Sequence, residues 1–170
     1  MRTLVIGGAA SGKSEYAETL ALESGTPRYY IATMQPCGDE GRARIEKHRR
    51  MRAERGFITL EQYTDIGAAK LERGATALLE CLGNLTANEL FSGEGRNVQA
   101  MLDGIALLEK SCNALIIVTN DVFCDGVAYD APTMTYLRAL AKLNNALAAR
   151  VERVVEVVCG IPLFLKGAAL

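Results

Sequence analysis

The segment at residues 7–14 is the sequence feature that most constrains the fold. It reads Gly7-Gly8-Ala9-Ala10-Ser11-Gly12-Lys13-Ser14 and fits the pattern G-x-x-x-x-G-K-[ST] at every defined position. The apolar residues 3–6 before it predict a buried strand, and residues 13–23 predict a helix that stops at Gly25. A strand, a glycine-rich turn and a helix in this order present backbone N–H groups and a positive helix end to phosphate.

Each residue type in this loop has its own chemical role. The small residues let backbone N–H groups point inward, Lys13 is expected to reach the β- and γ-phosphates, and the Ser14 hydroxyl is expected to coordinate Mg²⁺. The alternative is a glycine turn that carries a lysine by chance, which leaves the flanking strand and helix unexplained. We therefore expect all eight residues to bind a nucleoside triphosphate.

Strand and helix patterns alternate along the chain. This alternation predicts an α/β fold of the P-loop NTPase-like, three-layer kind with a mostly parallel central sheet, in a single nucleotide-binding domain over residues 1–170. Residues 120–131 have no periodic pattern, and loops of that length tend to be functional. The predicted strands are 3–6, 28–33, 57–62, 75–80, 114–119, 153–159 and 162–165, the last two as a hairpin across Gly160, and the predicted helices are 13–23, 40–55, 66–72, 85–91, 98–112 and 132–150.

Composition narrows the function classes. The formal net charge of −1 argues against a polyelectrolyte binder, so we expect no nucleic-acid partner. Five cysteines without a C-x-x-C pair argue against a disulfide framework and a zinc site. The apolar start is too short for a signal peptide and no apolar run approaches a membrane span, which predicts a cytoplasmic protein.

Two acidic residues that follow apolar strands are candidates for a second Mg²⁺ ligand. Glu80 ends the strand at residues 75–80, and Asp121 follows the strand at 114–119. Groups at the carboxyl ends of strands face the ligand crevice in open α/β sheets. Either acid could instead cap a helix or be a solvated loop charge.

Residues 40–55 predict a strongly basic helix that carries the only histidine. Arg44, His48 and Arg52 recur four residues apart and would share one helix face. Neighbouring cations lower the pKa of an imidazole, so His48 would be neutral and nucleophilic near pH 7. The alternatives are a solvated basic face with an incidental histidine, or a nucleic-acid patch, which lacks interleaved aromatic residues here.

The sequence resembles the bifunctional adenosylcobinamide kinase / adenosylcobinamide-phosphate guanylyltransferases of cobalamin biosynthesis over essentially its whole length. The phosphate loop is common to many NTPases, whereas the segment R-I-x-x-H-R-x-x-R at 44–52 and the G-I-P-L at 160–163 are more specific in combination. Further matching segments are residues 30–33, 57–61, 78–82 with Asn88, and 118–122.

The resemblance implies two reactions, with ATP and GTP as substrates and a corrinoid as acceptor. It implies phosphorylation of the aminopropanol hydroxyl of adenosylcobinamide, followed by GMP transfer from GTP through a guanylylated His48. It also implies a homo-oligomer, with a homotrimer as the expected form. The residues that it assigns to nucleotide binding, besides the phosphate loop, are Ala32, Thr33, Met34, Arg49, Arg50, Met51, Arg52, Glu61 and Glu80.

Two departures from the family pattern fall on the side that we assign to the corrinoid. Asp121 stands where many relatives carry Glu, and Lys142 stands where they carry Gly. Two other functions are considered: a different P-loop small-molecule kinase without a covalent histidine step, and a nucleotide-dependent switch, against which the missing N-K-x-D motif counts.

Overall fold

The computed structural model of the chain describes residues 1–36, 38, 45–46, 49–50, 52–92, 97–123 and 126–168. In this part of the chain, seven strands form one sheet in the order β3-β2-β4-β5-β1-β6-β7. All neighbours are parallel except β6 and β7, which pair antiparallel. The strands are β1 (Arg2–Gly7), β2 (Arg28–Ala32), β3 (Phe57–Glu61), β4 (Ala75–Glu80), β5 (Cys112–Asn120), β6 (Arg153–Val158) and β7 (Ile161–Lys166).

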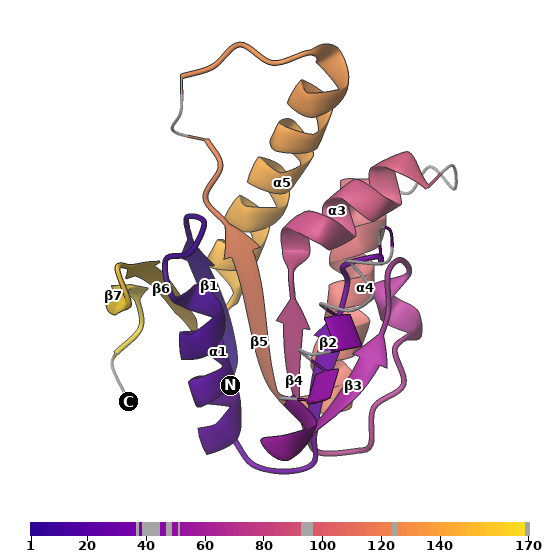
Figure 1. Cartoon of the computed structure of the whole chain (residues 1–170), viewed down its shortest axis with the longest axis vertical. Coiled ribbons are helices and arrows are strands. Elements are labelled where there is room, and N and C mark those ends of the chain that lie inside the picture. Colours follow the sequence, from indigo (N-terminus) through magenta and orange to yellow (C-terminus); the bar gives the residue numbers. More distant parts are fainter. Residues whose placement is uncertain are drawn as a thin grey trace.

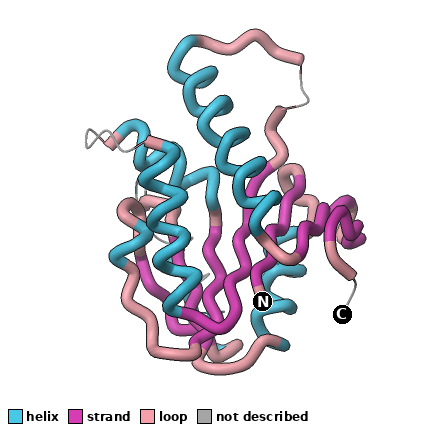
Figure 2. Tube along the Cα trace, turned by 180° about the vertical axis from the view of Figure 1, so that it is seen from behind, coloured by secondary structure: helices cyan, strands magenta, loops and turns pink. Residues whose placement is uncertain are grey.

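Helices cover both faces of the sheet, so the fold has three layers (Figures 1 and 2). One face packs against α1 (Lys13–Glu23), and the opposite face packs against the other helices, as the two core clusters show. Those helices are α3 (Leu82–Phe91), α4 (Val98–Ser111) and α5 (Ala131–Arg150).

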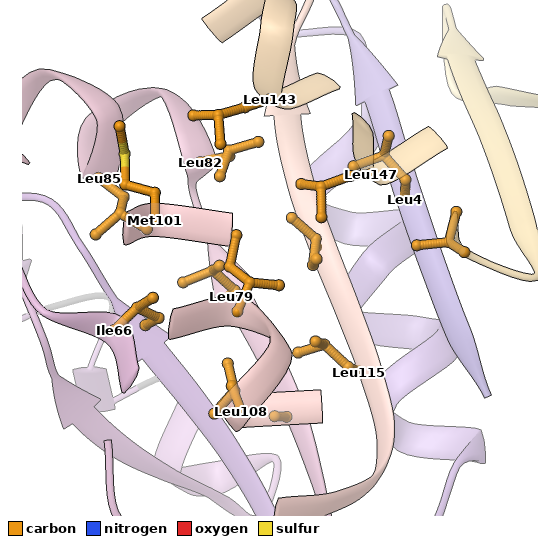
Figure 3. Packing of buried hydrophobic residues seen from close by; sticks show 14 of the residues in the cluster. Leu4, Ile66, Leu79, Leu82, Leu85, Met101, Leu108, Leu115, Leu143 and Leu147 are labelled. Atoms are coloured by element: carbon orange, nitrogen blue, oxygen red, sulfur yellow. The ribbon is translucent and has the colours of Figure 1, made fainter. Parts of the chain in front are cut away.

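Alternating side chains of the central strands separate the two cores. In β4, Leu78 packs with the α1 side and Leu79 with the α3–α5 side, and both are fully buried. Figure 3 shows the larger core, in which Leu79 and Leu115 of the sheet meet leucines of α3, α4 and α5. The strands read as continuous apolar runs because a parallel sheet with both faces covered leaves neither side to water.

Most predicted elements are confirmed, including the hairpin of β6 and β7, whose turn at Cys159 and Gly160 has positive φ angles of 51° and 78°. Within the predicted basic helix, the described residues 45–46, 49–50 and 52–54 are helical. No described helix combines the length and the apolar character that crossing a membrane requires.

The helix predicted at residues 66–72 is wrong beyond its first turn. Only the short 3₁₀ turn η1 (Ile66–Ala68) forms, and the chain then runs without regular structure to β4. A Cβ on Gly67 would lie 3.1 Å from the Cα of Gly104, so η1 sits directly against α4. Ala69 and Leu71 also pack against the larger core, and this burial outweighs a weak local helix preference.

Candidate nucleotide site

The carboxyl ends of five parallel strands meet at one edge of the sheet. Gly7, Ala32, Glu61, Glu80 and Asn120 are the last residues of β1, β2, β3, β4 and β5. The strand register places them side by side, since Ala32 is opposite both Glu61 and Glu80, and Gly7 is opposite Asn120. This edge is where an open α/β sheet binds its ligand.

The phosphate loop is shaped by backbone conformation and backbone hydrogen bonds. Ala10 and Gly12 have positive φ angles of 54° and 90°. The Ser11 N–H donates to Gly8 O at 3.4 Å, and the Gly160 N–H donates to Ser11 O at 2.8 Å. The loop is therefore held by one hydrogen bond between its own residues and by another from the turn between β6 and β7.

Glycine is required at two positions of the loop and permitted at a third. A Cβ on Gly7 would lie 2.5 Å from Ser11 Oγ and 2.8 Å from the carbonyl oxygen of Val157. A Cβ on Gly12 would lie 3.1 Å from Gly160 Cα, at a φ that side chains rarely adopt. A Cβ on Gly8 would meet nothing within 4 Å, so Gly8 leaves open space where a ligand can approach.

Lys13, Ser14 and Glu80 form the polar centre of the loop. The Lys13 ammonium donates to Gly8 O at 3.0 Å and so lies over the loop. The Ser14 hydroxyl donates to Glu80 Oε1. The other carboxylate oxygen, Glu80 Oε2, is buried and has no hydrogen-bond partner among the described residues. A hydroxyl beside a carboxylate with a spare oxygen is a donor set that suits Mg²⁺.

A cavity of about 520 Å³ extends from this centre toward the basic segment. Its lining includes Ser14 and Glu80 of this centre together with Arg49 and Arg52 of the basic segment. Its volume lies in the usual range for small-molecule sites, about 300–1,000 Å³. Of the phosphate loop only Ser14 belongs to this lining, where it meets strand-end and basic-segment residues, and residues 7–13 are absent from it.

Side-chain contacts hold the arginines at the cavity wall. The Arg52 guanidinium carbon lies 3.5 Å from the centroid of the Tyr30 ring, a cation–π contact. Arg49 pairs with Glu61 at 3.9 Å, and Arg55 donates to a Glu18 carboxylate oxygen at 2.6 Å.

Burial keeps two titratable groups of the cavity wall neutral. Burial and the charge of Glu80 raise the pKa of Tyr30 far above its ordinary value. Burial also raises the pKa of the Cys81 thiol, so Cys81 is uncharged at neutral pH. Because the thiolate is the reactive form of cysteine, this burial makes the Cys81 thiol less reactive.

The remaining sequence candidates separate into those that line the cavity and those that do not. Ala32 and Met34 line it. Thr33 does not; it is buried, and its hydroxyl donates to Cys81 O at 2.8 Å and accepts from the Cys81 N–H at 2.7 Å. Arg50 pairs with Glu46 at 3.2 Å and is absent from the cavity lining.

One other candidate is absent from the cavity lining, and three fall outside the described residues. Asp121 is absent from the cavity lining, and its N–H donates to Gly7 O at 3.1 Å. His48 and Met51 lie outside the described residues, as does Arg44.

Sequence reasoning missed several cavity residues. Tyr30 precedes the predicted strand end by three residues and reads only as an apolar strand position. Tyr63 and Asn84 follow strand ends, and that position was the one signal that could have found them. The Tyr63 hydroxyl donates to Glu61 Oε2 at 3.0 Å, so it orients that carboxylate.

The fold and the loop define a P-loop nucleotide-binding protein of the α/β class. The flagellar accessory protein FlaH from Methanocaldococcus jannaschii shares the fold, with a TM-score of 0.55 at 10% identity over 98% of this chain and 78% of that one. The family described as cobinamide kinase / cobinamide phosphate guanyltransferase matches residues 3–165, and the chain belongs to this family of enzymes.

Curated relatives match over their full lengths. The bifunctional adenosylcobalamin biosynthesis protein CobP of Pseudomonas aeruginosa is 35% identical over 176 residues, which cover all of both chains. The bifunctional adenosylcobalamin biosynthesis protein CobU of Escherichia coli is 33% identical over 184 residues, which cover 98% of this chain and all of the relative. These similarities place the chain among the enzymes of cobalamin biosynthesis.

Proposed function

We propose that the protein phosphorylates adenosylcobinamide with an NTP and then transfers GMP from GTP to the product through a guanylylated His48. The observation that carries the proposal is that Ser14 and Glu80 line the same cavity as Arg49 and Arg52. Family membership supports the corrinoid as the acceptor class.

In the first reaction the phosphate loop holds the β- and γ-phosphates. Backbone N–H groups of the loop and the Lys13 ammonium offset the negative charge that builds up during transfer. The aminopropanol oxygen of the corrinoid attacks the γ-phosphorus, and the bond from that phosphorus to the bridging oxygen breaks. The products are the corrinoid phosphate and a nucleoside diphosphate, and the proton of the alcohol is released to water.

Ser14 and Glu80 are the residues that would hold Mg²⁺. The support is chemical: both supply oxygen atoms, and Glu80 Oε2 is buried without a hydrogen-bond partner among the described residues. When bound, the ion would neutralise phosphate charge.

In the second reaction a ring nitrogen of His48 attacks the α-phosphorus of GTP. The bond between the α-phosphorus and the bridging oxygen breaks, and pyrophosphate leaves. An oxygen of the corrinoid phosphate then attacks the same phosphorus, the phosphorus–nitrogen bond breaks, and neutral His48 is restored. A covalent intermediate divides one difficult transfer into two easier ones. Arg49 and Arg52, one and four residues after His48, would stabilise the developing phosphate charge.

The part of the cavity that Glu61 and Tyr63 line would favour a guanine base. A carboxylate at Glu61 can accept hydrogen bonds from the N–H groups of the guanine edge, and the Tyr63 hydroxyl fixes that carboxylate. Ala32 and Met34 add apolar surface beside it. A homotrimeric assembly and a cytoplasmic location stay predictions from the sequence.

The direct test incubates the protein with Mg²⁺, GTP and adenosylcobinamide and follows the corrinoids by mass spectrometry. We expect a corrinoid phosphate first and a GDP-linked corrinoid later. His48→Ala should retain the first product and lose the second. If wild-type protein makes only the phosphate and forms no GMP adduct when the corrinoid is omitted, the protein is a kinase without the covalent step.

A further inference from the structure

A second concave surface lies between α3 and α5, outside the nucleotide cavity. It has a volume of about 280 Å³ and shares no lining residue with the larger cavity. Ala87 and Phe91 of α3 form one wall, and Pro132, Thr133 and Tyr136 of α5 form the other. We call these five residues the α3–α5 groove. Phe91 is 57% exposed, so its ring offers apolar surface to a ligand in the groove.

The hydroxyl of Tyr136 lies close to the first turn of α3. A Cβ placed on Gly83, in the first turn of α3, would lie 3.0 Å from the Tyr136 hydroxyl and 3.1 Å from Asn120 Nδ2. Asn120 Nδ2 in turn lies 3.9 Å from Cys81 Sγ. Tyr136 lines the groove and Cys81 lines the nucleotide cavity, so the side chains packed around Gly83 separate the two spaces by a thin wall.

The position of Tyr136 is fixed by the packing of α5 on the sheet. Two turns further along the helix, Asn144 is buried, and its side-chain oxygen accepts a hydrogen bond from the Thr119 hydroxyl at 2.7 Å. Leu140, between them on the same side, is fully buried. The first turns of α5 project beyond the sheet, toward the end where the strands terminate (Figure 1). The groove is therefore held rigidly next to the ligand edge of the sheet.

We propose that the α3–α5 groove binds the corrinoid ring of the acceptor, and that Tyr136 and Asn120 direct the acceptor alcohol toward the phosphate loop. This inference rests on the proposed function. A cavity of about 520 Å³ has the size that encloses one small-molecule ligand, so a large flat ring must rest outside it when the nucleotide is bound. Its alcohol, on a flexible side chain, must still reach the γ-phosphate.

The groove has the chemistry that this ligand requires. Aromatic and aliphatic side chains offer apolar contact to a ring, and most ligand sites combine such surface with a few placed polar groups. Here those groups are the phenol of Tyr136 and the carboxamide of Asn120, which lie close together near Gly83. Asp121, which departs from the family pattern, directly follows Asn120 at this end.

The first experiment measures adenosylcobinamide binding by equilibrium dialysis with protein that is loaded with a non-hydrolysable GTP analogue, using the visible absorbance of the corrinoid. Thr133→Trp fills the groove and should weaken corrinoid binding at least about tenfold, and Phe91→Ala should weaken it about three- to tenfold. Leu107→Ala, which removes an exposed side chain of α4 elsewhere, is the matched control and should bind like wild type. GMP labelling of each variant without corrinoid should stay at the wild-type level, because the nucleotide cavity is untouched.

The second experiment separates positioning from binding. Tyr136→Phe keeps the ring in the groove but removes the hydroxyl, so the kinase kcat should fall about tenfold while the KM for corrinoid changes less than about twofold. If wild-type protein phosphorylates the corrinoid and the groove variants bind and turn over as wild type does, the groove proposal is wrong and the proposed function stands. If wild-type protein neither binds nor phosphorylates a corrinoid, both fail.

Discussion

The two sides of the nucleotide cavity are held by different forces. The loop side is built from backbone: positive φ angles at Ala10 and Gly12, and a hydrogen bond from the Gly160 N–H to Ser11 O. The arginine side is built from side chains, with Arg52 stacked on Tyr30. Arg49 there reaches its glutamate only at 3.9 Å, and more than half of the Arg49 side chain is exposed.

This difference separates a preformed part of the site from an adaptable one. Backbone conformation and steric exclusion do not depend on salt or on the ligand. Ion pairs between partly exposed groups contribute only about 0–1 kcal/mol each and are screened by salt. We therefore expect the loop to hold its shape without nucleotide, and the arginines to exchange their glutamate partners for phosphate oxygens when GTP binds.

The largest effect should come from removing the cation of the loop. Lys13→Met should lower kcat/KM of the kinase reaction about 10²–10³-fold, since an ammonium aimed at the transferred phosphate is lost. The measurement is initial-rate production of corrinoid phosphate. Lys110→Met, an exposed lysine in the last turn of α4, is the matched control and should stay within about threefold of wild type.

The next largest effect should come from the loop backbone. Gly12→Ala forces a side chain into a positive φ and to within 3.1 Å of Gly160, and should cost about 1–3 kcal/mol of folding free energy. For a chain of this size that lowers the midpoint of thermal unfolding by about 2–4 °C per kcal/mol. Gly8→Ala, whose Cβ meets nothing, should change stability by less than about 0.5 kcal/mol. Equal losses in both variants would contradict the steric account of the loop.

A smaller effect should follow from losing the platform under Arg52. Tyr30→Leu removes the aromatic face, which contributes about 0.5–1 kcal/mol, so the KM for GTP in guanylyl transfer should rise about two- to fivefold. Tyr30→Phe keeps the face and removes only the hydroxyl, which interacts with Glu80, so its KM for GTP should rise less than that of Tyr30→Leu. Equal KM values in the two variants would show that the stacking does not position Arg52.

The smallest effect should come from the ion pair between Arg55 and Glu18. Glu18→Gln should reduce stability by less than about 1 kcal/mol, and the difference from wild type should shrink in high salt because the pair is screened. Chemical denaturation with urea at low and high salt measures it. If Glu18→Gln loses as much stability at high salt as at low salt, the ion pair between Arg55 and Glu18 belongs to the preformed part of the site.

The phosphate loop, the central strands and the turn between β6 and β7 could be predicted from the sequence. The octapeptide at 7–14 requires a strand before it and a helix after it, and apolar runs located the strands whose last residues are Gly7, Ala32, Glu61 and Glu80. The glycine at 160 also marked the hairpin turn correctly. These predictions succeed because steric limits and burial act locally and leave a residue pattern.

Contacts between distant segments could not be predicted in the same way. Nothing in the pattern around Tyr30 indicates that an arginine 22 positions later stacks on it. Gly83 reads as a loop residue, yet it lies inside α3. The structure favours glycine there because a side chain would meet Tyr136 and Asn120. Such positions are fixed by packing across the sheet, which a single sequence does not record.

The most direct test of the account is labelling with GTP that carries a radioactive α-phosphate, in the absence of corrinoid. The account predicts that wild-type protein acquires an acid-labile, alkali-stable label and that His48→Ala acquires none, while both bind GTP with similar affinity. Equal labelling of wild type and His48→Ala would contradict the covalent role of the basic segment.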